Sequence, residues 1–439
     1  MLHPTPNFPD RLYRIWGTVT EVSPGLILIG GISQFARLGN EIRVRTRQGE
    51  VFGEVLAVSG GHVKAMLYGE SDAILIGDRA VLEQEAYVEP GDHWLGKIVD
   101  YRGTISGESA IAPAANTTRR PLRASPPANT TRKSLGQRLS TGWMITDTIL
   151  PICQGQRMGL FAGSGVGKST FLGSLAAGVK ADRVVIALIG ERSREVNEFV
   201  HKTLPKDVLS RTVIVAATAN DPPGAKKRAA LCAIATAEHF RDEGHQVLFL
   251  FDSITRFAEA HREVSLSAGE TPALNAFPPS TVRAIAEVAE RTGPGAQGQG
   301  DITAIFSVLV AGSDMEEPVA GMVISSCRGR YPNADGIPLL MFCAVSRDVY
   351  QMRPNQMKTE SSRITDGRLH SMKKSRRCCA PICMSEDMTQ PEIDPSNASR
   401  SWTISFQSRI PDIFHKPSST FRACWTLLRP PKNPSSTRC

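Results

Sequence analysis

The chain has 439 residues, 41% of them hydrophobic, and its 51 Lys and Arg against 43 Asp and Glu give a formal net charge of +8. The apolar share excludes a wholly disordered chain, and the length predicts two or three domains. No apolar run approaches the roughly 18 residues that a membrane helix needs. The first ten residues lack the basic and apolar regions of a secretory signal. We therefore expect a cytoplasmic protein.

The positive charge is concentrated in one part of the sequence. Residues 1–320 hold 33 basic and 34 acidic side chains, whereas residues 321–439 hold 18 basic and 9 acidic ones. Seven of the nine cysteines also lie in the second part. The first part is nearly neutral, so the net charge does not predict a nucleic-acid partner.

Short β-type segments separated by Gly and Ser-Pro-Gly breaks fill residues 11–90. They are rich in β-branched and aromatic residues and contain stretches that alternate with a period of two. The segments are residues 11–22, 26–32, 41–46, 51–58 and 62–69. This pattern predicts a small barrel or sandwich in an N-terminal domain, residues 1–98.

Residues 99–139 are interpreted as a linker between domains. The stretch 103–138 is rich in Pro, Thr, Ala and Arg and contains the sequence ANTTR twice, thirteen residues apart. Asn116 and Asn129 each begin an N-x-T sequon, but we do not expect glycosylation without a secretory route. The composition indicates a solvated segment that tolerates change.

Compact apolar runs alternate with helical patterns between residues 140 and 320. The runs are typical of strands buried on both faces of a sheet, and they cover residues 157–163, 183–190, 212–218, 246–252 and 302–310. The helical patterns cover residues 168–179, 194–202 and 225–241. Repeating strand–helix units predict an α/β domain with a mostly parallel sheet, for which we expect residues 140–350.

A phosphate-binding loop is the strongest chemical signal in the sequence. AGSGVGKST follows the run 157–163 and precedes a helical pattern, which is the context that the motif G-x-x-x-x-G-K-[ST] requires, although Ala162 replaces its first Gly. Glycines let backbone N–H groups turn toward a phosphate, and the helix N-terminus favours an anion. The residues predicted to bind the nucleotide here are Gly163, Ser164, Gly165, Val166, Gly167, Lys168, Ser169 and Thr170.

Carboxylates end two of the apolar runs. Asp252 closes the run 246–252, where it would hold the Mg²⁺ shell together with Ser169. Glu191 follows the run 183–190 and is the candidate for orienting an attacking water. Arg192 is available for the developing phosphate charge. A helix N-cap at Asp252 and a solvated charged turn at 191–195 are the alternative interpretations.

Four segments together resemble the flagellum-specific and type III secretion export ATPases, relatives of the catalytic subunit of the rotary ATP synthases. They are GLFAGSGVGKST, IGERSREVNEF, VLFLFDSITRFAEAHREV and ITAIFSVLVAGSDMEEPVA, in the order of the family. The resemblance covers roughly residues 15–320. It implies an N-terminal β-barrel, a RecA-like ATPase core and a small helical C-terminal domain, expected at residues 351–439.

The resemblance also implies a mechanism and partners. A homohexamer would hydrolyse ATP with Mg²⁺ and energise protein export beneath the flagellar basal body. Partners would be the stator, chaperones and substrates of the export apparatus, with peripheral association at the membrane export gate. The implied roles are Lys168 and Ser169 for phosphate and Mg²⁺, Glu191 as the catalytic carboxylate, Arg192 and Glu195 for the γ-phosphate and the metal's water shell, Asp252 for Mg²⁺, and Arg256 near the phosphates. The stretch 277–280 resembles a loop near the hexamer pore.

The resemblance is lost after residue 320. The family expects a stretch like DGHIVMSRA, and codons for it read one base late give MVISSCRG, which is the sequence of residues 322–329. We therefore hypothesise a frameshift near residue 320, from a sequencing error or a real mutation. Tryptic peptides from residues 360–439 of the native protein would rule out the sequencing error. The family's arginine that acts in a neighbouring subunit falls in this region, and Ser346-Arg347 is the nearest match.

Several alternatives stay open. A virulence-type secretion ATPase would share the chemistry, a hexameric RNA helicase would need a base-stacking barrel surface, and a non-catalytic ATP-binding fragment would follow if the tail is real. Cys378, Cys379 and Cys383 are interpreted as chance cysteines because they lack partner ligands for zinc. The basic run 373–377 is interpreted as solvated.

Overall fold

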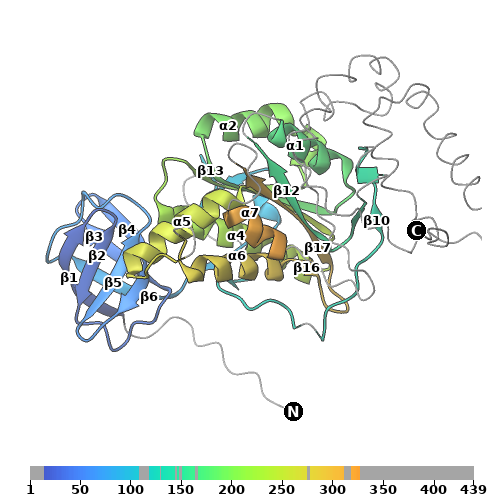
Figure 1. Ribbon diagram of the computed structural model, residues 1–439. Helices are drawn as coiled ribbons and strands as arrows, with labels where there is room; N and C mark the ends of the chain where they lie inside the picture. Colours follow the sequence, from blue (N-terminus) through green and yellow to red (C-terminus); the bar gives the residue numbers. More distant parts are fainter. Residues whose placement is uncertain are drawn as a thin grey trace, which may run out of the picture. The chain divides into compact units, whose positions relative to one another are not determined.

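The computed structural model describes residues 14–107, 118–128, 130–143, 146–147, 151–163, 167–273, 277–310 and 318–326 (Figure 1). The sequon residues Asn116 and Asn129, the loop residues Ser164, Gly165 and Val166, and all the predictions for residues 327–439 lie outside the described residues. Within the described ranges, no helix is long and apolar enough to cross a membrane.

The N-terminal domain is a closed barrel with the strand order β1-β2-β5-β4-β3-β6. Its strands are β1 Ile15–Ser23, β2 Leu26–Gly30, β3 Asn40–Thr46, β4 Gly49–Val58, β5 His62–Leu67 and β6 Arg79–Glu85. Alternate residues of these strands fill the interior, among them Val19, Ile29 and Val63, which have no exposed surface. The expectation of a barrel is confirmed, and β6 is the strand that the sequence pattern did not predict.

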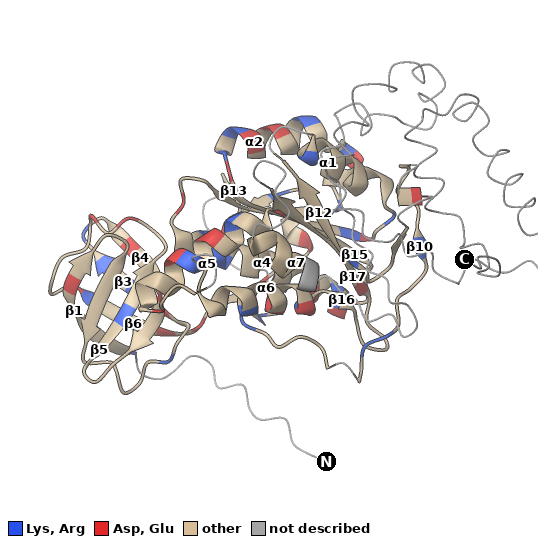
Figure 2. Cartoon of the chain, in the orientation of Figure 1, with Lys and Arg blue, Asp and Glu red and all other residues tan. Residues whose placement is uncertain are grey.

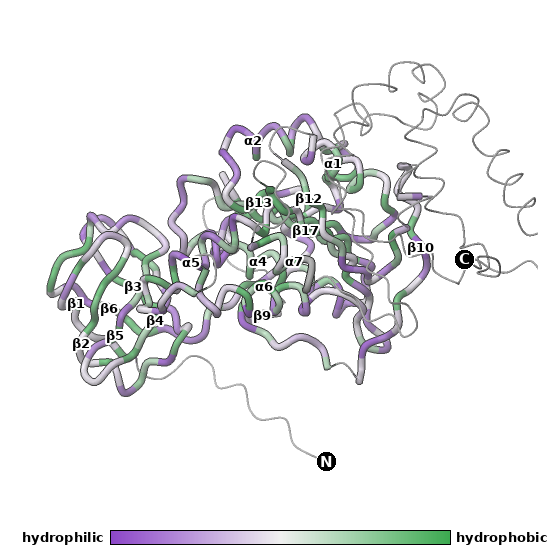
Figure 3. The backbone as a smooth tube through the Cα atoms, viewed as in Figure 1, coloured by the Kyte–Doolittle hydropathy of each residue, from purple (hydrophilic) through white to green (hydrophobic). Residues whose placement is uncertain are grey.

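A mostly parallel sheet forms the core of the second domain, with the order β12-β17-β15-β13-β14-β8. The strands are β12 Arg157–Ala162, β17 Asp301–Leu309, β15 Val247–Asp252, β13 Arg183–Glu191, β14 Thr212–Thr218 and β8 Ile98–Val99, with β16 Gly293–Pro294 antiparallel to β17. Figure 3 shows hydrophobic residues running along these strands. The predicted α/β fold with a parallel sheet is therefore confirmed.

Helices connect and cover these strands (Figure 1). They are α1 Lys168–Gly178, α2 Ser193–Glu198, the π-helical η3 Phe199–Thr203, α3 Lys206–Leu209, α4 Pro223–Asp242, α5 Ile254–Ala268, α6 Pro279–Arg291 and α7 Pro318–Ser326, with a 3₁₀ turn η1 Asp92–Trp94 in the barrel-to-core connection. Their limits follow local chemistry. Ser253 caps α5 by accepting a hydrogen bond from the backbone N–H of Arg256, and Gly269 ends the helix in the left-handed conformation.

Most described residues of the predicted linker are exposed or half-buried, in line with its composition, but a few of them contact the core. Short pairs form between β7 Tyr87–Val88 and β9 Arg120–Pro121, and between β10 Arg138–Leu139 and β11 Ile152–Cys153. Leu122 is only 2% exposed. Arg132 donates a 2.9 Å hydrogen bond to the carbonyl of Thr292, beyond the end of α6. Long-range contacts of this kind are invisible in a composition rich in Pro, Thr and Arg.

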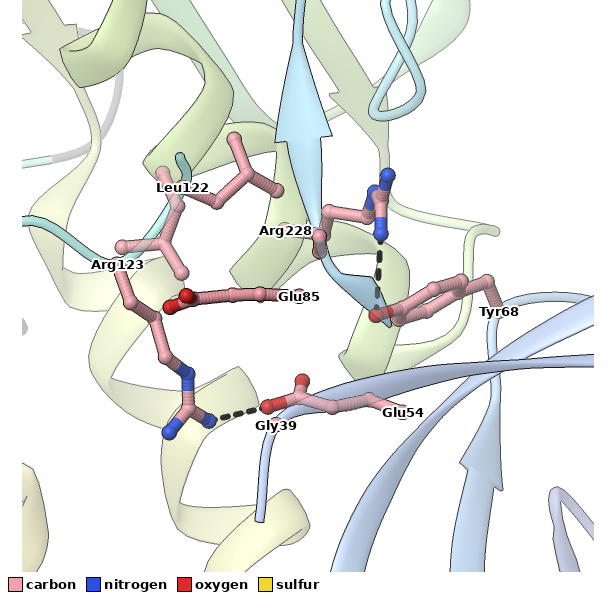
Figure 4. Close-up of a pocket in the computed structure, with 9 residues that line it drawn as sticks. Gly39, Glu54, Tyr68, Glu85, Leu122, Arg123 and Arg228 are labelled. Carbon is pink, nitrogen blue, oxygen red and sulfur yellow. Dashed lines mark hydrogen bonds and ion pairs between the residues drawn. The ribbon is translucent and has the colours of Figure 1, made fainter. Parts of the chain in front are cut away.

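Charged side chains join the barrel to the core, and we call Glu41, Glu54, Arg123, Lys227 and Arg228 the interface cluster. Lys227 Nζ of α4 lies 3.1 Å from both carboxylate oxygens of Glu54 on β4, which also pairs with Arg123. Arg228 Nη1 lies 2.8 Å from Glu41 Oε1 on β3. Three members of the cluster, Glu54, Arg123 and Arg228, also line a small pocket. Figure 4 shows Arg123 pairing with Glu54 on one side of it and Arg228 reaching Tyr68 on the other.

Candidate active site

The predicted phosphate loop joins β12 to α1. Gly163 follows directly after β12. Gly167, the next residue that the structure describes, is the N-cap of α1. Gly167 has φ of 95°, a left-handed conformation that side chains other than glycine rarely adopt. Ser169 and Thr170 are exposed in the first turn of α1, where backbone N–H groups are free of helical partners. This end of the helix suits an anion.

Lys168 lies between the two predicted carboxylates. Its Nζ is 2.5 Å from Asp252 Oδ1 and 3.8 Å from Glu191 Oε1. The two acidic residues come together because β13 and β15 are neighbouring parallel strands, with Leu188 opposite Asp252 in the register. Carboxyl ends of such strands form the edge where open α/β sheets bind ligands. The structure thus brings Lys168, Glu191 and Asp252 into one site.

Asp252, the last residue of β15, is 1% exposed, and the neighbouring strand β17 fixes its side chain. Besides Lys168, the hydroxyl of Ser307 on β17 donates a 2.6 Å hydrogen bond to its Oδ1. Just beyond, the backbone N–H of Leu309 donates to the hydroxyl of Thr255, 2.9 Å away, which ties β17 to the start of α5. Ser307 escaped the sequence analysis because a single hydroxyl within ITAIFSVLV has the appearance of a core residue.

The pKa of Glu191 is raised to about 7. Burial is the largest cause and the negative charge of Asp252 adds to it, while Lys168 acts in the opposite direction. A hydrogen bond with Glu195 raises the pKa further. The buried carboxylate of Asp252 and the half-buried carboxylate of Glu191 therefore share one cation, so with both carboxylates ionised this site carries more negative charge than Lys168 neutralises.

The remaining predicted residues surround this centre. The backbone N–H of Arg192 donates to Glu195 Oε2 at 3.4 Å, and the Arg192 side chain is 82% exposed. Arg256 pairs with Glu259 at 2.8 Å. It also packs against Gly190, where a Cβ atom would lie 2.8 Å from Cβ of Arg256. The Arg192 guanidinium lies 3.8 Å from Glu195 and stays largely exposed, whereas Arg256 pairs with Glu259 on its own helix. Figure 2 shows charged residues of both signs along α2 and α5.

The donor set suits Mg²⁺ when it accompanies a nucleotide. Among the described residues, no group of three or more His, Cys, Asp or Glu could hold a metal ion alone. Mg²⁺, however, is usually held by one or two carboxylates, retained waters and substrate phosphates. The buried carboxylate of Asp252, the exposed hydroxyl of Ser169 and the surplus negative charge fit that mode.

The fold and this site define a P-loop nucleotide-binding protein with a RecA-like core. The model of the ATP synthase alpha/beta family, nucleotide-binding domain, matches residues 142–332. The flagellum-specific ATP synthase of Rhizobium meliloti is 41% identical over 71% of this chain and 66% of its own length, and that of Treponema pallidum is 42% identical over 64% and 62%. That of Aquifex aeolicus is 36% identical over 79% and 80%. The chain belongs to the ATP synthase alpha/beta family, among the flagellum-specific ATP synthases.

The resemblance seen in the sequence is thereby confirmed. The chain spans 66% of the length of the Rhizobium meliloti relative, 64% of that of the flagellum-specific ATP synthase of Agrobacterium fabrum, and 62% of that of the Treponema pallidum relative. The frameshift near residue 320 is not tested by these matches and stays a prediction.

Proposed function

We propose that this chain is a Mg²⁺-dependent ATP phosphohydrolase that acts as a homohexamer and energises flagellar protein export. The observation that carries the proposal is the position of Lys168, 2.5 Å from Asp252 and 3.8 Å from Glu191 at the opening of a phosphate loop. Family membership supports the same reading.

The side chains have complementary tasks in this proposal. The ammonium of Lys168 exchanges its contact with Asp252 for the β- and γ-phosphates of ATP, while backbone N–H groups of residues 163–168 bind the same oxygens. Asp252 and Ser169 would hold Mg²⁺, and Glu195, which hydrogen-bonds to Glu191, would support its water shell. When bound, the ion would neutralise charge on the phosphate oxygens.

Glu191 and Arg192 perform the transfer itself. The carboxylate of Glu191 orients the attacking water and accepts its proton, for which a pKa of about 7 is well matched to neutral pH. The guanidinium of Arg192, which the structure leaves exposed, turns toward the γ-phosphate and stabilises the charge that develops there.

The cellular role rests on the relatives. Those of Rhizobium meliloti and Aquifex aeolicus are named flagellum-specific ATP synthases, which favours a flagellar over a virulence-type system. The proposed partners are the stator, chaperones and substrates of the export apparatus. The proposed location is the cytoplasm, at the inner-membrane face of the basal body beside the export gate.

Steady-state ATP hydrolysis measured against protein concentration tests the proposal. We expect turnover per chain to rise as the protein assembles, to require Mg²⁺ and to be lost in Lys168→Ala. Nucleotide binding without turnover at any concentration would instead favour the non-catalytic fragment. Stimulation of turnover by RNA would favour the helicase, and we expect none.

A further inference from the structure

The hydroxyl of Ser307 is a buried group that the proposed reaction does not yet use. It lies on β17 and has no exposed surface, and the residues on either side of it in that strand are apolar. Its 2.6 Å hydrogen bond to Asp252 joins β17 to the end of the neighbouring strand β15. A hydrogen bond to an ionised acceptor is about twice as strong as one between neutral groups.

Ser307 and Lys168 contact the same oxygen of Asp252. Lys168 Nζ lies 2.5 Å from Oδ1, and the Ser307 hydroxyl lies 2.6 Å from it. The lysine stands on the helix that follows the phosphate loop, so it is the contact that a bound phosphate would remove. Ser307 stands on a buried strand and would keep its contact when the lysine leaves.

We propose that Ser307 is a positioning residue that fixes the carboxylate of Asp252 for Mg²⁺. With Oδ1 fixed by the hydroxyl, Oδ2 is the oxygen that remains for the ion or its waters. The inference rests on the proposed function, because it concerns the metal that accompanies ATP. Groups that orient a metal ligand typically change metal affinity by about 10- to 100-fold when they are removed.

A purely structural role makes a different prediction. A hydroxyl that only satisfies a buried carboxylate would stabilise the fold, and its loss would weaken nucleotide binding equally with and without Mg²⁺. A positioning role confines the loss to the state that contains Mg²⁺. The two roles are therefore separated by the ratio of nucleotide affinities with and without the ion.

The experiment measures binding of a fluorescent ATP analogue to the full chain, in Mg²⁺ and in EDTA. We expect Ser307→Ala to reduce the Mg²⁺-dependent gain in affinity by about 10-fold or more while the affinity in EDTA stays unchanged. Ser307→Thr, which keeps the hydroxyl, should restore the gain. A titration of Mg²⁺ at fixed nucleotide should show the same shift in its midpoint.

Thr303 provides a matched control on the same strand. It is a buried hydroxyl four residues away, and it accepts a 3.0 Å hydrogen bond from the backbone N–H of Gly155 rather than contacting Asp252. Thr303→Val should lower the melting temperature without changing the Mg²⁺-dependent gain. The inference is overturned if Ser307→Ala keeps the wild-type gain, or loses affinity equally in both buffers. Absence of any gain in the wild-type chain would overturn the proposed function as well.

Discussion

The interface cluster and the candidate active site are two of the charge groups among the described residues, and they are balanced in opposite ways. In the interface cluster, Glu54 is buried, yet its pKa is lowered because the attraction of Lys227 and Arg123 outweighs the burial. In the candidate active site, the pKa of Glu191 stays raised because burial and then the repulsion of Asp252 outweigh the attraction of Lys168, the single lysine that serves both carboxylates.

The difference separates a structural use of charge from a functional one. Glu41, which pairs with Arg228, also has a raised pKa, but there burial is the largest cause, the neighbouring arginines oppose it, and repulsion by Glu83 contributes less than either arginine. At the active site the repulsion by a second carboxylate, Asp252, comes directly after burial and exceeds the opposing effect of Lys168. Strongly perturbed groups in such a setting are candidates for binding and catalysis. The negative phosphates of a nucleotide cannot relieve the repulsion between Asp252 and Glu191, whereas a divalent cation can. We therefore expect nucleotide and cation together to stabilise the site more than the nucleotide alone.

The largest effect is expected from Glu191→Gln. Hydrolysis should fall by about 10²- to 10⁴-fold because the variant loses its general base. The melting temperature of the free protein should rise, since the substitution removes one of two repelling carboxylates. Glu198→Gln at the end of the following helix α2, where the side chain is exposed, should change neither quantity by much. A lower melting temperature for Glu191→Gln would contradict the comparison between the two charge groups.

Glu54→Gln tests the opposite case. The variant leaves the buried Lys227 without its counter-charge and removes the partner of the more exposed Arg123, which should cost about 3–5 kcal/mol of unfolding free energy. Urea denaturation measures this loss. Glu50→Gln is the control, because Glu50 lies on the same strand but pairs with Arg43 at the surface, and it should cost less than about 1 kcal/mol. Equal costs for the two variants would show that the interface cluster is not balanced as described.

The two charge groups also differ in what the sequence could predict. Lys168, Glu191 and Asp252 were predicted to meet because each ends or follows an apolar run, and carboxyl ends of parallel strands share one edge. Glu54 and Lys227 are separated by 173 positions, and neither belongs to a motif. Their pairing depends on how the barrel packs on α4, which no local pattern encodes.

Other elements of the structure were likewise predicted where a local pattern encodes them and missed where a distant contact does. The barrel strands with clear alternation were predicted, but β6 reads RAVLEQE, in which three consecutive buried residues hide the period of two. Ser307 was missed because its role depends on a neighbouring strand. Arg132 was missed because its partners are backbone carbonyls 158 and 160 positions away.

A pH dependence should come from His261, which lies near the interface cluster. Burial, followed by the positive charge of Lys227, lowers its pKa to about 4, while Glu270 and Glu54 partly oppose this and Arg123 adds to it. The unfolded state, with an ordinary pKa near 6.5, therefore takes up the proton first. Stability from this residue is complete above pH 6.5 and is lost as the pH falls toward 4, by about 2–3 kcal/mol.

Unfolding free energies of the wild type and His261→Gln across this range check the prediction. The difference between the two proteins should shrink as the pH falls from 6.5 to 4, because the variant has no imidazole to protonate. Acidic residues titrate in both proteins and cancel in the difference. A constant difference would show that His261 does not titrate on unfolding.

The smallest effect is expected from Arg132→Met in the packed part of the predicted linker. Arg132 donates to the carbonyls of Glu290 and Thr292 at the end of α6, so its loss should leave them partly unsatisfied at a cost of about 1–2 kcal/mol. The exposed Arg45, changed in the same way, should cost well under 1 kcal/mol. Chemical denaturation of the two variants decides whether this segment is structural or dispensable.

The two-residue strand β8 has a consequence for dissecting the molecule. Ile98 and Val99 follow the barrel in the chain, but they pair with Ile214 and Val215 at the outer edge of the core sheet. A deletion that removes the barrel as a cassette up to residue 107 would therefore strip the core of its last strand and open the hydrogen-bonding edge of β14 to intermolecular pairing. Chimaeras between relatives should be spliced ahead of η1, near residue 90, so that the sheet keeps the strand that the preceding segment supplies.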